Sequence, residues 1–282
     1  MKKLLRILVV LTFILTISAH GTACQKNENG VILISIDGLR QDAVANTEYG
    51  RYLMQNSAYS LDVQTVSPSI TLPCHLSMFY GVSPDVHGVL SNTFSTNNNL
   101  RKGIAETLIQ SSVFTSIFYN WQPITNTVGG VAVVNKYISA DNIGWERANE
   151  LTAEACINHL NNTPSNLVVL YLGFLDENGH AYGWLSQEYY YALNQSFLIA
   201  QNVVSVAKEL NYTVIITSDH GGHDYTHGTT LDEDMKIPLF IIGNGYEKGR
   251  NLGTRSILDI APTITTLLGC QPQYYWQGTA IK

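Results

Sequence analysis

The sequence predicts an α/β fold in which a mostly parallel central sheet carries helices on both faces. Short runs rich in β-branched and aromatic residues alternate with longer stretches that have the spacing of helices, which is the order typical of parallel sheets. The strand-like runs are apolar almost throughout, as are strands covered on both faces. Hydrophobic residues make up 45% of the chain and charged residues 13%, against a usual charged share of about 25%. This composition excludes a disordered chain.

The elements follow one another along the chain at regular intervals. Strands are predicted at residues 31–36, 113–119, 167–172, 213–217 and 239–242, where the apolar runs are short and rich in Val and Ile. Helices are predicted at residues 100–110, 147–160, 187–210 and 259–268, and Pro262 fits the first turn of the last one. Because no internal repeat or long low-complexity linker occurs, residues 25–282 are predicted to form a single domain.

Residues 1–24 have the pattern of a secretory signal peptide. A basic start (residues 1–6) precedes an apolar run (residues 7–19) and the small residues 21–23. Cys24 follows directly, as the lipidated cysteine does in bacterial lipoproteins. The alternative is a buried amino-terminal helix, which would need neither the basic start nor the small residues. We therefore expect an exported protein of the bacterial periplasm or cell envelope, or a secreted one, with membrane attachment if Cys24 carries lipid.

Charge and cysteine content narrow the function classes further. The formal net charge is −6, and such a chain lacks the dense Lys and Arg that bind a nucleic-acid polymer. Cys74, Cys156 and Cys270 are scattered, and no Cys-x-x-Cys pattern suggests a thiolate metal site. Neither the disulfide pairing nor the oligomeric state follows from these patterns.

Three predicted strands are each followed by an aspartate. Asp37 comes directly after residues 31–36, Asp176 shortly after residues 167–172, and Asp219 two residues after residues 213–217. The carboxyl ends of parallel strands meet at one edge of the sheet, which is the usual ligand crevice. A carboxylate there often caps the next helix instead. Three of them close together need a cation for neutralisation, so the pattern favours a metal site.

Histidines accompany two of these aspartates. His180 lies four residues after Asp176, His220 is adjacent to Asp219, and His227 follows in a glycine-rich segment. Imidazole with carboxylate suits zinc better than calcium. These six side chains exceed what one tetrahedral ion needs. Two ions about 4 Å apart are the arrangement that stabilises attacking and leaving oxygens at phosphorus, so we predict two divalent ions, zinc rather than calcium.

A hydroxyl nucleophile is suggested by the segment around Thr71. Pro73 fits the first turn of a helix and places Thr71 at its positive amino end. An alkoxide there would be stabilised by that end and by metal coordination. Without the predicted metal residues, Thr71 would be interpreted simply as a helix cap.

Taken together, the motifs resemble a known family. Ile34-Ser-Ile-Asp37-Gly38, Thr71-x-Pro73-x-His75, Asp176-x-x-Gly179-His180, Ser218-Asp219-His220-Gly221 and His227-Gly228 occur in this order. The chain resembles the alkaline phosphatase superfamily, and specifically its nucleotide pyrophosphatase/phosphodiesterase branch, over about residues 31–270. The resemblance implies one zinc ion held by Asp176, His180 and His227. It implies a second ion held by Asp37, Asp219 and His220, with Thr71 as the nucleophile bound to it.

The implied activity is hydrolysis of phosphodiester or pyrophosphate bonds in small molecules through a phosphorylated Thr71. Within the same superfamily, the alternative is a phosphomonoesterase or a phosphoryl-group transferase. From another class, a non-catalytic, metal-stabilised binding lipoprotein is the alternative. The branch usually carries Asn where this chain has Cys74, a weaker donor. As candidates for contact with the substrate we list Cys74, Tyr119, Trp121 and His223.

Overall fold

The computed structural model describes residues 30–95, 100–128 and 130–282. The predicted signal peptide and Cys24 lie outside these residues. Within them, eight strands form one sheet in the order β4-β3-β5-β1-β6-β7-β2-β8. Their bounds are β1 Val31–Ile36, β2 Ala58–Gln64, β3 Thr115–Tyr119, β4 Val134–Tyr137, β5 Leu167–Leu172, β6 Thr213–Thr217, β7 Lys236–Ile242 and β8 Arg255–Ser256. Only the β7 pairings with β6 and β2 are antiparallel.

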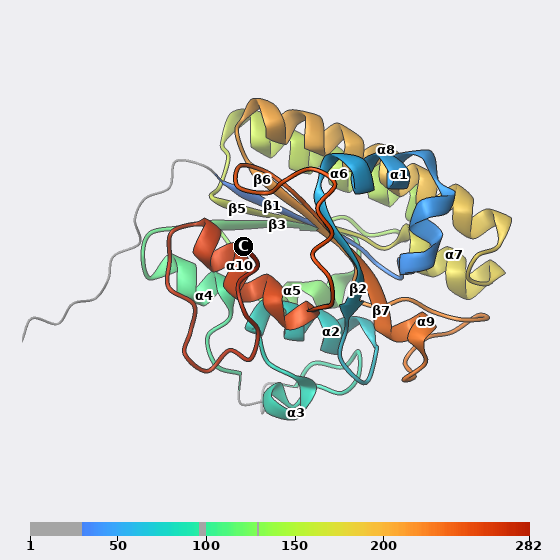
Figure 1. Ribbon diagram of the computed structural model, residues 1–282, viewed down its shortest axis with the longest axis horizontal. Helices are drawn as coiled ribbons and strands as arrows, with labels where there is room; N and C mark the ends of the chain where they lie inside the picture. Colours follow the sequence, from blue (N-terminus) through green and yellow to red (C-terminus); the bar gives the residue numbers. More distant parts are fainter. Residues whose placement is uncertain (1–29, 96–99, 129) are drawn as a thin grey trace, which may run out of the picture.

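Helices connect the strands and cover both faces of the sheet (Figure 1). The α-helices are α1 Glu48–Asn56, α2 Thr71–Tyr80, α3 Pro84–His87, α4 Ile104–Ile109, α5 Thr125–Val128, α6 Trp145–Asn162, α7 Phe174–Tyr182, α8 Gln187–Glu209, α9 Asp232–Met235 and α10 Ile260–Leu267. Short 3-10 helices are η1 Gln41–Asn46, η2 Gln122–Ile124 and η3 Ile257–Asp259. In Figure 1, α1, α6 and α8 lie over one face, and α2, α4, α5 and α10 lie over the other. Across the described residues, no helix combines the length and the hydropathy needed to span a membrane.

The core has two halves, one on each side of the sheet. Successive side chains of a strand point to opposite faces, so Val31 and Leu33 of β1 pack in one half. Ile32, Ile34 and Ile36 pack in the other half, against α6 and α8. Strands covered on both faces are apolar at nearly every position, and the burial of β1 on both faces confirms the α/β fold predicted from the apolar runs.

The strands that carry the predicted site have the bounds predicted for them. β1, β5 and β6 span residues 31–36, 167–172 and 213–217. They are neighbours with β1 in the middle, and Ile36 pairs with Leu172 while Ser35 pairs with Thr217. Their carboxyl ends therefore lie at the same level of the same sheet edge. The chain leaves each strand at this edge, and one of the three aspartates follows within four residues.

Other elements differ from the prediction at their ends or were missed. β7 begins three residues earlier than predicted and β3 two residues later. Three strands were not predicted: β2, which alternates between buried and half-buried positions, the edge strand β4, which is mostly exposed, and the two-residue β8. Lateral strands lack the continuous apolar run that identifies a central strand.

Candidate active site

Asp37, Asp176 and Asp219 meet at the carboxyl edge of β1, β5 and β6. Asp37 directly follows β1, Asp176 lies in the first turn of α7, and Asp219 follows β6. Gly38 makes the approach close: its φ is +73°, and a Cβ there would lie 3.0 Å from Asp176 Cα. The Gly38 N–H also points to Asp219 Oδ1 at 3.3 Å. A side chain at position 38 would be strained and would push the carboxylates apart.

Each of the three carboxylates keeps one buried oxygen without a hydrogen bond. Among the described residues, none donates to Asp37 Oδ1, Asp176 Oδ1 or Asp219 Oδ2. Burial raises the pKa of Asp37 and of Asp176 well above the ordinary value, and repulsion from Asp219 raises both further. Burial would also raise the pKa of Asp219, but His220 and His75 face this carboxylate and lower it. Buried oxygens of this kind need a positive partner.

Three histidine side chains turn the same ring nitrogen toward this cluster. In each ring, Nδ1 lies within hydrogen-bond distance of a backbone carbonyl oxygen, which can only accept. These pairs are His180 with Tyr225 O at 3.0 Å, His220 with Gly221 O at 2.8 Å and His227 with Ser69 O at 2.8 Å. Each Nδ1 is therefore the donor, and the Nε2 atom of a neutral ring keeps its lone pair. Burial lowers the pKa of His220, and it lowers that of His227 to about 3.

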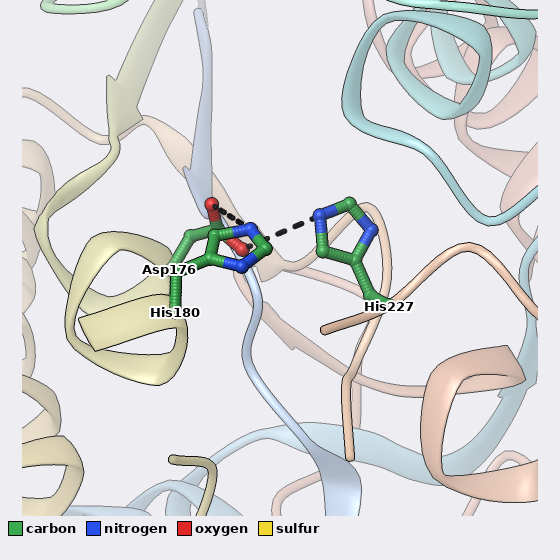
Figure 2. A group of neighbouring side chains, drawn as sticks. All are labelled: Asp176, His180 and His227. Carbon is green, nitrogen blue, oxygen red and sulfur yellow. Dashed lines mark ion pairs between the residues drawn. The ribbon is translucent and has the colours of Figure 1, made fainter. Parts of the chain in front are cut away.

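The Nε2 atoms face the carboxylate oxygens. His180 Nε2 lies 3.5 Å from Asp176 Oδ2, and His227 Nε2 lies 3.8 Å from Asp176 Oδ1 (Figure 2). Figure 2 shows Asp176 and His180 on one helix, with His227 reaching toward them from a separate loop. One ligand atom from each of these three residues lies within 4.8 Å of the others.

A second group adjoins the first. His220 Nε2 lies 3.3 Å from Asp37 Oδ1 and 3.3 Å from Asp219 Oδ2. Ligand atoms of Asp37, Asp176 and His220 also lie within 4.8 Å of one another, so Asp176 is common to both groups. Lone pairs of neutral imidazoles that face buried carboxylate oxygens repel each other unless a cation lies between them. The donor set therefore fits divalent metal ions with nitrogen and oxygen ligands.

Thr71 lies beside this cluster at the start of α2. Its Oγ1 is 3.2 Å from His220 Nε2, and the side chain is buried. Pro73 occupies the first turn of the helix, as predicted, so its missing N–H costs no helical hydrogen bond. The structure thus brings the six predicted ligand side chains and the predicted nucleophile into one place.

The contacts around these residues come from buried neighbours. Tyr171 O–H donates to Asp37 Oδ2. His75 is fully buried, with Nδ1 at 2.8 Å from Thr71 O and 3.3 Å from Asp219 Oδ2. Its Nε2 lies 2.9 Å from Ser35 Oγ. Both ring nitrogens are in use inside the protein, so His75 links the backbone at Thr71 to Asp219 and Ser35.

The four residues suggested for substrate contact lie in different surroundings. Cys74 is fully buried, and its Sγ lies 3.3 Å from Thr65 Oγ1, so a substrate cannot reach the thiol. Tyr119 is buried and donates its hydroxyl to Asn135. Trp121 is half-buried and stacks against Tyr171, with the ring centroids 6.4 Å apart. His223 Nδ1 lies 2.7 Å from Oδ1 of Asp234 in α9.

Asn92 is a residue that the sequence analysis missed. Its side-chain oxygen accepts the N–H of Leu72, the residue after Thr71, at 3.0 Å. This contact holds an exposed amide beside the amino end of α2. Asn92 lies 21 residues after Thr71 in a polar loop, and no local pattern in the sequence points to it.

Comparisons with known proteins give the family and the fold of the chain. The family model described as type I phosphodiesterase / nucleotide pyrophosphatase matches residues 31–239. No curated protein matches the chain. Among solved structures, murine ectonucleotide pyrophosphatase/phosphodiesterase 5 is similar, as an inactive threonine-to-alanine variant in complex with AMP. Its TM-score is 0.72 at 14% identity over 87% of this chain and 96% of that one.

Two further structures share the fold. The human counterpart of the murine protein has a TM-score of 0.70 at 16% identity, over 87% of this chain and 96% of that one. The phosphonate monoester hydrolase of Agrobacterium radiobacter has a TM-score of 0.68 at 15% identity, over 90% of this chain and 76% of that one. At these identities the likeness concerns the fold, which is that of the alkaline phosphatase superfamily.

Proposed function

The chain belongs to the type I phosphodiesterase/nucleotide pyrophosphatase family, and on this premise we propose that it cleaves phosphodiester or pyrophosphate bonds through a phosphorylated Thr71. The observation that carries the proposal is the position of Thr71 Oγ1. It lies at the amino end of α2 and 3.2 Å from His220 Nε2, against a cluster of carboxylates and imidazoles that fits metal ions.

The two groups of ligand atoms would hold two divalent ions, with zinc favoured by the mixture of imidazole and carboxylate. Asp176, His180 and His227 would hold one ion, and Asp37, Asp219 and His220 the other, with Asp176 close to both. When bound, the ions supply positive charge that lowers the pKa of a hydroxyl or water and neutralises charge on the leaving oxygen.

The side chains of the protein position the reaction in two steps. Thr71 loses its hydroxyl proton to solvent and Oγ1 attacks phosphorus in line. An Oγ1–P bond forms, the bond from phosphorus to the leaving oxygen breaks, and the leaving oxygen takes up a proton from solvent. Water then attacks phosphorus from the vacated side, and the Oγ1–P bond breaks to restore Thr71. The amino end of α2 and the amide of Asn92 would donate hydrogen bonds to the non-bridging oxygens. Asn92 would thereby supply the amide donor that the family usually carries at the position of Cys74.

A diester substrate is favoured by the charge around the site. Among the described residues, no Lys or Arg side chain forms a hydrogen bond or ion pair with Thr71 or with the six ligand side chains. A phosphomonoester carries one more negative charge than a diester, and binding it calls for a further cation. The AMP complex of the murine relative supports a small phosphate-ester ligand for this chain too.

The test is turnover of an aryl phosphodiester and an aryl phosphomonoester by the zinc-loaded protein and its T71A and T71S variants. We expect the diester to be preferred, T71A to lose at least about 10³-fold in kcat/KM, and T71S to keep part of the activity. Mass spectrometry after rapid acid quench should find, on residue 71 of the wild type, a phosphoryl group that still carries the remaining ester group of the diester. Diester turnover that is equal in wild type and T71A would contradict the nucleophile. A preference for the monoester would favour the phosphomonoesterase alternative. A wild type that shows neither turnover nor a labelled residue 71 would favour the non-catalytic binding lipoprotein.

We also propose that the protein is exported, from the basic start, the apolar run and the small residues before Cys24. Cell fractionation with a C24S variant tests this. Export without membrane attachment in C24S, together with membrane attachment of the wild type, would support lipidation. A full-length chain that remains in the cytoplasm would contradict export.

A further inference from the structure

A fourth buried carboxylate lies outside the ligand cluster. Asp234, in the short helix α9 directly before β7, has no exposed surface. Unlike the three cluster aspartates, it has partners on both oxygens. Oδ1 accepts from His223 Nδ1 at 2.7 Å, while Oδ2 accepts from the Thr229 N–H at 2.8 Å and from Thr229 Oγ1 at 2.7 Å.

These partners lie in the loop of residues 220–229, which carries two of the ligand histidines. His223 lies three residues after His220, and Thr229 lies two residues after His227. One carboxylate therefore joins residue 223 to residue 229 at the end of this loop. The backbone adds to this, because the Gly221 N–H donates to Asp234 O at 2.9 Å. Charge-assisted hydrogen bonds to a buried carboxylate are short and strong, so they fix the spacing between these two residues of the loop.

The same contacts continue to the nucleophile. Ser69 Oγ donates to Thr229 O at 2.7 Å, and Ser69 O accepts from His227 Nδ1 at 2.8 Å. Ser69 lies two residues before Thr71. A displacement of Thr229 would therefore move the carbonyl that orients the His227 ring and the segment that leads into α2.

We propose that Asp234 is a positioning residue that holds His220 and His227 at the spacing required for metal binding and couples both to the segment before Thr71. The proposal rests on the proposed function, because it assumes that these histidines bind metal. Outer contacts of this kind orient metal ligands, and their loss costs about 10- to 100-fold in metal affinity.

The experiment measures zinc affinity by competition with a chromophoric chelator, along with the melting temperature of each metal-free protein. D234N removes the charge and one acceptor at constant shape. D232N is the matched control, because Asp232 lies on the same short helix but is exposed and pairs with Lys236 at 2.7 Å. T229V removes the hydroxyl contact at a more exposed position, and T229S restores it.

We expect D234N and T229V to bind zinc about 10- to 100-fold more weakly than wild type, with D232N and T229S within about threefold. Excess zinc should restore kcat in D234N, since all ligand side chains remain. Zinc affinity in D234N equal to that in D232N would overturn the proposal, as would a kcat that excess zinc does not restore. If D234N does not fold, the zinc affinities of T229V and T229S are compared instead, and equal affinities would overturn the proposal. A wild type that binds no zinc would overturn the proposed function itself, and this inference with it.

Discussion

Replacement of Asp176 by Asn should stabilise the metal-free protein while it weakens metal binding. Ligand oxygens of Asp37 and Asp176 lie within 4.8 Å of each other, and Asp176 Oδ1 has no hydrogen-bond partner among the described residues. Coulomb's law gives about 3.5 kcal/mol for two unit charges at this separation and an effective dielectric constant of about 20. Asp176 also lies in the first turn of α7, where loss of its charge costs up to about 1 kcal/mol.

The net gain at pH 7.5 is then about 2.5 kcal/mol, and for a chain of this size it corresponds to a rise in melting temperature of roughly 5–10 °C. The gain should shrink toward pH 5. Burial and repulsion from Asp219 raise the folded-state pKa of Asp176 above its unfolded value. The cost to the wild type is therefore absent below the unfolded pKa of about 4 and grows as pH rises through the folded pKa.

The assay is thermal unfolding of wild type, D176N and the D232N control, each in chelator and in zinc. Zinc at about 100 times its dissociation constant stabilises a one-site protein by about 2.7 kcal/mol. Because Asp176 belongs to both groups of ligand atoms, D176N should gain much less from zinc than wild type, and most of its lead in stability should disappear. The reasoning is refuted if D176N melts below D232N in chelator, or if zinc stabilises D176N as much as wild type.

Two further predictions separate residues that the sequence alone does not distinguish. N92A should lower kcat/KM on the diester by about 10²-fold, as loss of an oxyanion donor does. C74A should change it by less than about threefold, because the thiol is buried away from the substrate side, and equal losses would contradict these roles. Burial lowers the pKa of His87 to about 4, so folding stability should fall as pH drops below about 6.5, where the unfolded state takes up the proton. H87Q should remove roughly 1–3 kcal/mol of that loss between pH 6.5 and pH 4 in urea unfolding, and an unchanged slope would exclude His87 as its source.

The parts of the fold that could be predicted are those in which burial leaves a continuous signal. β1, β5 and β6 lie at the centre of the sheet and are buried at every position and mostly apolar, so their ends, and with them the aspartates, could be located. β2 and β4 lie toward the sheet edges; β2 mixes buried with half-buried positions and β4 is mostly exposed, so the same criterion missed them. A central strand can be recognised from its own sequence. A lateral strand is recognised only from the strands that pair with it in the folded chain.

The site divides in the same way. The ligand types and Thr71 follow strand ends and a helix start, and both are local features. Asn92 is brought to Leu72 by the path of a polar loop. Asp234 reaches His223 and Thr229 through a short helix beyond the ligand loop. Neither contact has a sequence spacing that recurs for a physical reason, so only the folded chain identifies them.

The hydrogen bonds of the histidines indicate how the protein divides the work of the site. His180, His220 and His227 are each oriented by a backbone carbonyl, so the direction of each ring is set by the fold. The three carboxylates instead keep buried oxygens without donors, and they bear the electrostatic cost of the cluster. Loss of metal should therefore raise the energy of the carboxylates without turning the rings. For this reason a charge-removing substitution such as D176N, rather than a change in the ligand loop, is expected to stabilise the metal-free chain.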